Sequence, residues 1–124
     1  MNIPDNLKYS KDHEWVSVNG SIATVGITDF AQSQLGDIVY VDVQTLDETL
    51  STGDVFGAIE AVKTVADAFM PVSGKIVEIN DLLADTPELV NTDPYGKGWM
   101  VKIEISDQAE LSTLLSPSDY EKLL

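Results

Sequence analysis

The residue with the clearest potential for chemistry is Lys63, which lies between two apolar runs within residues 55–74. An ammonium group must stay hydrated or paired, so a lysine is poorly suited to the middle of an apolar, β-prone stretch. The simplest structure places Lys63 at the tip of a tight hairpin, with strands at 54–61 and 64–70 and a turn at 71–74. A lysine displayed in this way is a candidate for covalent modification, and an ordinary turn lysine is the alternative.

Other reactive residue types are scarce. The chain has no cysteine, which excludes a disulfide framework, a thiolate nucleophile and a cysteine-type zinc site. Its one histidine, His13, cannot form a multi-histidine metal site, and without a partner base it is a poor catalyst. We therefore expect His13 to pack or hydrogen-bond at the start of a strand. We predict no catalytic residues and no metal. Because the chain has no cysteine, any sulfur chemistry must come from a cofactor.

The charge is strongly acidic. Among 124 residues there are 21 acids against seven lysines and no arginine, for a net charge of −14. Such a field repels nucleic acids and anionic membranes, and it steers the chain toward basic surfaces; solubility alone is the competing explanation. The N-terminus lacks the pattern of a secretory or transit peptide, so we expect a cytoplasmic protein, although a mature mitochondrial form would look the same. We also expect a monomer.

The elements before the lysine follow from local patterns. Residues 14–18 and 21–27 predict a hairpin around Asn19-Gly20, a pair that suits a type I′ turn. Thr28 can cap a helix over 29–35, and Gly36 can end it. The strand expected at 37–43 is apolar on nearly both faces, which favours a central position in a sheet.

The elements after the lysine comprise more short strands and a helical tail. We expect strands at 75–79 and 99–105, and short turns capped by Asn80 or Asp81 and begun by Thr86-Pro87-Glu88. In the tail, Asp107 and Glu110 read as a capping box. Three leucines form one apolar helix face, and Ser116-Pro117 can begin a final helix. The three leucines are Leu111, Leu114 and Leu115.

A six-residue echo between 25–30 and 77–82 suggests two similar halves. The predicted fold class is mainly β: a flattened β-sandwich or barrel of short strands in two quasi-symmetric halves, with short helices and a C-terminal helical extension. We expect a single domain over 1–124, with its core at about 14–105 and the helical segment at about 107–124.

The hairpin resembles the lipoyl-lysine hairpin of the glycine cleavage system H-protein family. The stretch from Phe56 to Lys63 matches, as do Asp67 and the turn at 71–74. Further matching blocks, in the same order, run from about residue 7 to the C-terminus. They are His13-Glu14-Trp15, Gly26-Ile27-Thr28, Leu35-Gly36-Asp37, Leu89-Val90-Asn91 and Pro94 to Trp99. The resemblance implies a barrel-sandwich carrier with lipoate joined to Lys63, and not an enzyme.

The implied role is that of a swinging-arm carrier in glycine catabolism and one-carbon metabolism. Its implied partners are a pyridoxal-phosphate glycine decarboxylase that loads the arm and a tetrahydrofolate-dependent aminomethyltransferase that unloads it. Dihydrolipoamide dehydrogenase would reoxidise the dithiol, and a lipoyl ligase or octanoyltransferase would attach the group. The alternatives are a relay protein that donates lipoyl or octanoyl groups, a biotinyl or 2-oxoacid dehydrogenase lipoyl domain, and an unmodified β-rich interaction module.

Three acids are candidates for supporting roles. Glu14 and Asp67 lie in matching blocks and could line a groove that holds the protonated amine of the loaded arm away from water. Glu60, three residues before the lysine, is a candidate for recognition by the ligase. For each of them a solvated surface acid is the alternative.

The chain also departs from the family pattern beside the lysine. The family usually has serine where this chain has Ala61, and often alanine and then serine where it has Val65 and Ala66. These departures bear on how efficiently a given ligase modifies Lys63.

Overall fold

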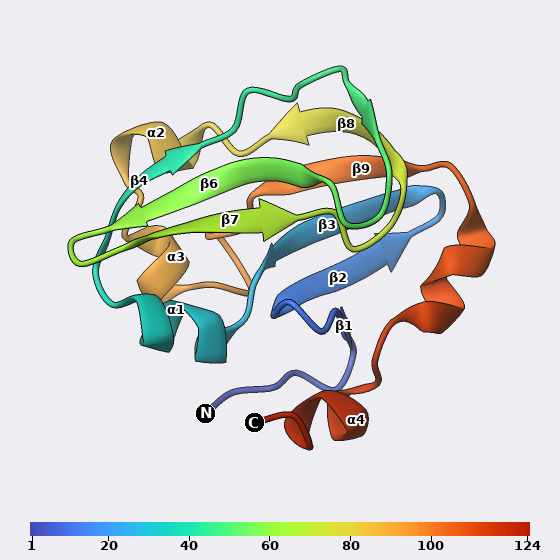
Figure 1. Cartoon of the computed structure of the whole chain (residues 1–124), viewed down its shortest axis with the longest axis horizontal. Coiled ribbons are helices and arrows are strands. Elements are labelled where there is room, and N and C mark those ends of the chain that lie inside the picture. Colours follow the sequence, from blue (N-terminus) through green and yellow to red (C-terminus); the bar gives the residue numbers. More distant parts are fainter.

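The computed structural model describes all residues, 1–124, and shows two β-sheets packed face to face (Figure 1). The larger, six-stranded sheet has the order β1-β2-β3-β9-β8-β5, and the smaller, three-stranded sheet has the order β4-β6-β7. All pairs are antiparallel. The strands are β1 (Lys8–Tyr9), β2 (Glu14–Asn19), β3 (Ile22–Ile27), β4 (Ile38–Asp42), β5 (Thr49–Leu50), β6 (Val55–Ala61), β7 (Val65–Phe69), β8 (Gly74–Ile79) and β9 (Val101–Ile105). The expected mainly β, two-layered fold is confirmed.

Short helices connect and flank the sheets. They are α1 (Asp29–Leu35), α2 (Leu82–Asp85), α3 (Leu89–Thr92), the 3-10 helix η1 (Gln108–Thr113) and α4 (Pro117–Glu121). As expected, Thr28 caps α1 by accepting a hydrogen bond from the Ala31 N–H, and Gly36 ends the helix at a φ of 80°. None of these helices is long and apolar enough to cross a membrane.

The β2–β3 hairpin forms where the sequence predicts it, but with a different turn. Asn19 pairs with Ile22, so the two loop residues are Gly20 and Ser21. Only Gly20 has a positive φ, of 64°. That pattern meets the requirement of a type II′ turn, and the expected type I′ turn is wrong, because Asn19 belongs to the strand and not to the loop.

The prediction that the fourth strand is central is also wrong. β4 is an edge strand that pairs only with β6, and Val39 and Tyr40 are 53% and 47% exposed. Pairing is irregular between Ile38 and Tyr40, where a β-bulge shifts the register. The apolar side chains of β4 therefore reflect a partly exposed edge and not burial on both faces.

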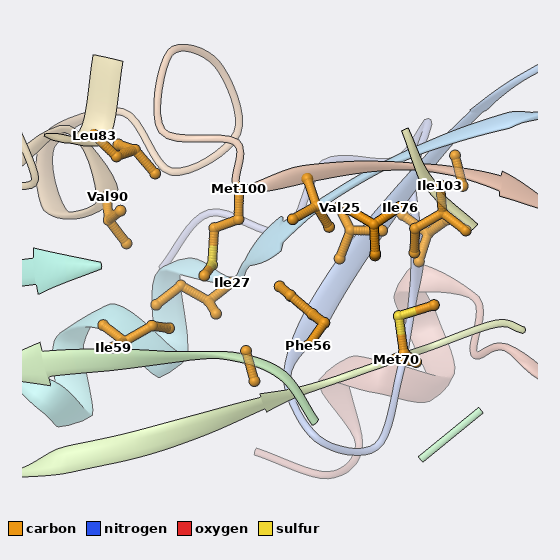
Figure 2. Packing of buried hydrophobic residues seen from close by; sticks show 14 of the residues in the cluster. Val25, Ile27, Phe56, Ile59, Met70, Ile76, Leu83, Val90, Met100 and Ile103 are labelled. Carbon is orange, nitrogen blue, oxygen red and sulfur yellow. The ribbon is translucent and has the colours of Figure 1, made fainter. Parts of the chain in front are cut away.

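The core fills the space between the two sheets. A cluster of 18 buried apolar residues draws on both layers, and Figure 2 shows Phe56 and Ile59 of β6 facing Val25 and Ile27 of β3. A smaller cluster of Leu7, Tyr9, Trp15 and Tyr120 ties the C-terminal helix to the N-terminal strands. Because β6 contributes to the main core, the hairpin that carries Lys63 is anchored at its base.

The tail differs from the expected helix. Asp107 caps η1 by accepting from the Ala109 N–H, but Glu110 does not complete a capping box. Its carboxylate instead accepts hydrogen bonds from the N–H and the hydroxyl of Ser73 and from the Thr52 hydroxyl. Those bonds lower the pKa of Glu110 and fasten η1 to the turn after β7.

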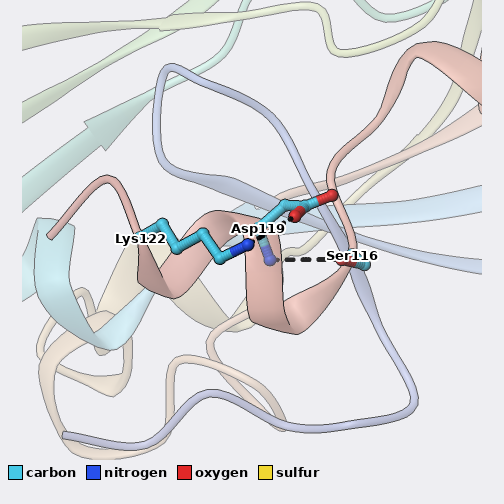
Figure 3. A network of polar contacts seen from close by, with 3 residues as sticks. All are labelled: Ser116, Asp119 and Lys122. Atoms are coloured by element: carbon cyan, nitrogen blue, oxygen red, sulfur yellow. Dashed lines mark hydrogen bonds and ion pairs between the residues drawn. The ribbon is translucent and has the colours of Figure 1, made fainter.

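The three tail leucines do not share one helix face. Leu111 and Leu114 pack on the main core, whereas Leu115 is extended and forms a β-bridge with Tyr9. The final helix begins as predicted. The Ser116 hydroxyl caps it by accepting from the Asp119 N–H, and Asp119 forms an exposed ion pair with Lys122 at 3.6 Å (Figure 3).

Candidate functional site

Strands β6 and β7 form a hairpin with a short connecting turn (Figure 1). Lys63 lies in that turn, at the tip of the hairpin, as the sequence predicts. A hydrogen bond of 2.8 Å from the Ala61 N–H to the Thr64 carbonyl closes the turn. The lysine is exposed, and its ammonium forms neither of the two ion pairs in the molecule. Its amine is therefore free to be acylated.

The hairpin tip rests on the turn between α1 and β4. The Val62 N–H donates to the Asp37 carbonyl at 3.0 Å. Gly36, with its positive φ, lies under the lysine stem, where an added methyl group would meet Lys63 Cε at 3.5 Å. The lysine is therefore supported by the turn between α1 and β4 as well as by its own hairpin.

Asn91 of α3 holds that supporting turn in place. Its Nδ2 donates to the Gly36 carbonyl at 2.9 Å and to Gln32 Oε1 at 3.0 Å. Its Oδ1 accepts from the Ile38 N–H at 2.9 Å. One side chain thus satisfies polar groups on both sides of the turn, which fixes the surface beneath Lys63.

A groove of about 320 Å³ opens between the hairpin, the start of β2 and helix α1. Its walls bring Glu14 and Asp67 together, as the sequence analysis proposed. The lining residues are Asp12, His13, Glu14, Ile27, Phe30, Ala31, Gln34, Leu35, Ile59, Ala66 and Asp67. The groove therefore combines a mainly apolar wall with carboxylates.

Glu14 is a buried carboxyl, only 1% exposed, so the alternative of a solvated surface acid is wrong for this residue. The Ser10 hydroxyl donates to Oε1, and the Phe69 N–H of β7 donates to Oε2 at 3.2 Å. Burial raises the pKa of Glu14 from its ordinary value of 4.5 to about 7, and the two hydrogen bonds oppose that rise. Near neutral pH the group can therefore exist in either protonation state.

The other two candidate acids have different surroundings. Asp67 is exposed and stands opposite Ala58 of β6. Glu60 is half-buried, stands in register with Tyr40 on one side and Val65 on the other, and does not line the groove. Asp67 and Glu14 thus share a site, and Glu60 does not belong to it.

His13 meets its expectation of a hydrogen-bonding residue at the start of a strand. Its Nδ1 lies 2.8 Å from the Tyr120 hydroxyl, and its ring centroid lies 4.9 Å from that of Phe30. Sequence reasoning did not place His13, Phe30 or Asp12 on the groove. The adjacency of Asp12 and His13 to Glu14 was the one signal available for two of them.

The departures from the family pattern occupy three different settings. Ala61 is buried and pairs with Ile38, whereas Val65 is 60% exposed beside the lysine. Ala66 is half-buried and lines the groove. Only Ala66 therefore lies where it can alter the shape of the groove.

Comparison with known proteins identifies the family. The family model described as Glycine cleavage H-protein matches residues 7–124. A protein of Carboxydothermus hydrogenoformans named Glycine cleavage system H protein is 57% identical over 122 residues, which cover 98% of this chain and 94% of that protein. The crystal structure of a glycine cleavage system H protein from Mycobacterium marinum superposes with a TM-score of 0.86 at 38% identity, covering 97% of each chain. The chain therefore belongs to the glycine cleavage H-protein family, whose members serve the glycine cleavage system as its lipoyl carrier and not as a catalyst.

Proposed function

We propose that Lys63 carries lipoate as an amide, and that the chain shuttles an aminomethyl group between the enzymes of the glycine cleavage system. The observation that carries the proposal is the pairing of an exposed, unpaired lysine at a hairpin tip with a carboxylate-containing groove beside the same hairpin. A carrier needs its attachment point on a rigid element, and the hairpin base packed into the core provides one.

The residues around Lys63 fit the group. The hairpin turn and the segment held by Asn91 fix the Cα of the lysine, and the side chain extends from this mount into solvent. Acylation removes the ammonium charge and leaves the net charge one unit more negative. When bound, the lipoyl group supplies the sulfur chemistry and the electron-carrying dithiol, which a chain without cysteine cannot supply itself.

The groove fits the end of a loaded arm. Ile27, Phe30, Leu35 and Ile59 offer apolar contact and displace water. Glu14 offers a carboxylate with little access to solvent, where attraction to a protonated amine is stronger than at the surface. A cation beside Glu14 lowers the pKa of its carboxyl and so favours the charged form that binds it. Asp67 adds a second negative charge at the rim.

The partners proposed are a pyridoxal-phosphate glycine decarboxylase, a tetrahydrofolate-dependent aminomethyltransferase and, as the acceptor of electrons, dihydrolipoamide dehydrogenase. A lipoyl ligase or octanoyltransferase attaches the group, and Glu60 is the candidate for its recognition because it flanks the lysine outside the groove. The net charge of −14 favours encounter with basic docking surfaces on these enzymes.

Intact-mass measurement tests the attachment site. The unmodified chain is incubated with lipoate, ATP and a lipoyl ligase, alongside Lys63→Arg and a matched control, Lys97→Arg. We expect one lipoyl group on the parent chain and on Lys97→Arg, and none on Lys63→Arg. Modification of Lys63→Arg, or none on the parent chain, would contradict the assignment.

A second measurement separates the shuttle from a lipoyl-relay protein. The modified chain is added to glycine decarboxylase, aminomethyltransferase and dihydrolipoamide dehydrogenase with glycine, tetrahydrofolate and NAD⁺ as the oxidant, and carbon dioxide release is followed. A shuttle supports repeated turnover, whereas a relay protein modified at Lys63 supports none.

A further inference from the structure

The C-terminal helix α4 places one hydroxyl directly behind the groove. Tyr120 is fully buried, and its ring stacks on Tyr9 with centroids 4.7 Å apart and planes at 9°. Its hydroxyl oxygen lies 2.8 Å from His13 Nδ1 and 2.7 Å from Thr28 Oγ1. Tyr120 does not line the groove itself. It instead contacts His13, which lines the groove, and Thr28, which caps the helix α1 that supplies further lining residues.

Those two segments form one wall of the groove. His13 lines it directly, and Thr28 caps α1, the helix that contributes Phe30 and its neighbours. A backbone hydrogen bond of 3.0 Å from the Thr28 N–H to the His13 carbonyl links the same segments. The Tyr120 hydroxyl adds a side-chain link at the same junction. The C-terminus of the chain is in this way built into the site.

We propose that Tyr120 is a positioning residue for the groove: its hydroxyl holds His13 against Phe30 and against the cap of α1, and so sets how well the groove protects a loaded arm. The inference rests on the proposed carrier function and adds to it a role for the C-terminal helix.

The backbone at His13 shows why such a tie is needed. His13 has a φ of 68°, in the left-handed region that residues other than glycine seldom adopt. A conformation of this kind persists only where surrounding contacts hold it. The side-chain contacts available are the Tyr120 hydroxyl at Nδ1, the Phe30 ring with centroids 4.9 Å apart, and the Tyr120 ring, edge-on with centroids 5.6 Å apart. Loss of the hydroxyl leaves only these two ring contacts, neither of which is a hydrogen bond, to orient the imidazole.

The hydrogen bonds at this junction are mutually consistent. Burial lowers the pKa of His13, which favours the neutral imidazole, and a neutral Nδ1 can accept a hydrogen bond from the Tyr120 hydroxyl. The Tyr120 oxygen can then accept a hydrogen bond from the Thr28 hydroxyl, while Thr28 Oγ1 accepts one from the Ala31 N–H at 3.2 Å. Removing the Tyr120 hydroxyl breaks this chain in the middle.

The test compares Tyr120→Phe with Tyr9→Phe. Each variant keeps its ring and removes one hydroxyl from a fully buried tyrosine of the same cluster. The Tyr9 hydroxyl donates to the Pro4 carbonyl at 2.7 Å and touches neither His13 nor α1, so Tyr9→Phe controls for a general loss of stability. Urea unfolding confirms that both variants are folded.

The first readout uses the unmodified chain. In Tyr120→Phe we expect the His13 Nδ1 resonance to shift and the cross-peaks between the His13 and Phe30 rings to weaken. Both signals should be retained in Tyr9→Phe. A Tyr120→Phe spectrum that keeps both signals would show that the hydroxyl does not position His13, and it would overturn the inference.

The second readout is the half-life of the aminomethyl-loaded chain. We expect Tyr120→Phe to shorten it about three- to tenfold, the effect of losing one hydrogen bond. Tyr9→Phe should not change it, and both variants should be lipoylated at the parent rate. Equal half-lives in both variants would overturn the inference while leaving the carrier function intact. A parent half-life no longer than that of the loaded chain in urea would instead contradict the protective groove itself.

Discussion

The tip of the β6–β7 hairpin and the junction around Glu14 serve one proposed function with opposite physical properties. Lys63 is exposed, and its side chain is free of ion pairs, so it contributes little to the folded state. Glu14 is buried and bonded to Ser10 and to the β7 backbone, which joins the two sheets. An attachment point must be exposed, which requires a side chain with few contacts to the fold. A group that shields the bound cargo must be fixed, which requires a side chain that the fold holds firmly. Substitutions in the two regions should therefore affect stability very differently.

The largest effect on stability is expected for Glu14→Gln. The folded-state pKa of Glu14, about 7, is above its ordinary value of 4.5, so the folded chain binds more protons than the unfolded chain between those values. The free energy of unfolding of the parent chain should then fall as pH rises through this window, by up to about 1.4 kcal/mol per pH unit from this group alone. Gln keeps an acceptor for Phe69 and a partner for Ser10, and it removes this pH-dependent loss.

Urea unfolding at several pH values between 4 and 8 measures this difference. Asp67→Asn, which also removes one negative charge, controls for the change in net charge. Parallel curves for the parent chain and Glu14→Gln would contradict the burial assigned to this carboxyl.

An intermediate effect is expected at the support beneath the lysine. Asn91→Ala removes the partners of the Gly36 carbonyl and the Ile38 N–H, and we expect it to cost about 1–3 kcal/mol of unfolding free energy. Thr92→Ala on the same helix removes only a 3.3 Å exposed bond within that helix and serves as the control. Hydrogen exchange at Val62 should rise in Asn91→Ala, because its acceptor is the neighbouring Asp37 carbonyl. Hydrogen exchange at Val62 equal to that in Thr92→Ala would show that Asn91 does not support the hairpin tip.

The smallest effect is expected at the lysine. Lys63→Arg should leave the free energy of unfolding within about 0.5 kcal/mol of the parent value, since surface substitutions away from special features have little effect. Urea unfolding measures it. A loss comparable to that of Asn91→Ala would show that the lysine stem contributes packing on Gly36 that the exposed geometry does not reveal.

The sequence predicts features that depend on neighbours along the chain. The hairpin at Lys63, the Thr28 cap, the Gly36 helix end and the final helix at Ser116 are all found where local patterns place them. Each of them rests on an interaction within a few residues, so one stretch of sequence contains the necessary information.

Features that depend on distant partners are missed. The burial of Glu14 is completed by the Phe69 N–H, 55 residues away, and Glu110 turns from its own helix to Ser73, 37 residues away. Tyr120 reaches His13 across 107 residues. The edge position of β4 likewise depends on which strands pair, and its apolar composition does not reveal it. The lysine could therefore be predicted from sequence, whereas the walls of its groove could be predicted only in part.

The central proposal is that Lys63 attaches the arm and that a separate groove around Glu14 protects its load. The most direct test is the rate at which the aminomethyl-loaded chain decays. The half-life is measured near pH 7 for the parent chain, Glu14→Gln and Asp67→Asn, each fully lipoylated at Lys63. Because Glu14 is the buried carboxylate, we expect Glu14→Gln to shorten the half-life by about tenfold or more, the effect of losing a charged partner at a buried site, and Asp67→Asn to shorten it less. Unchanged half-lives in both variants would contradict the protective groove.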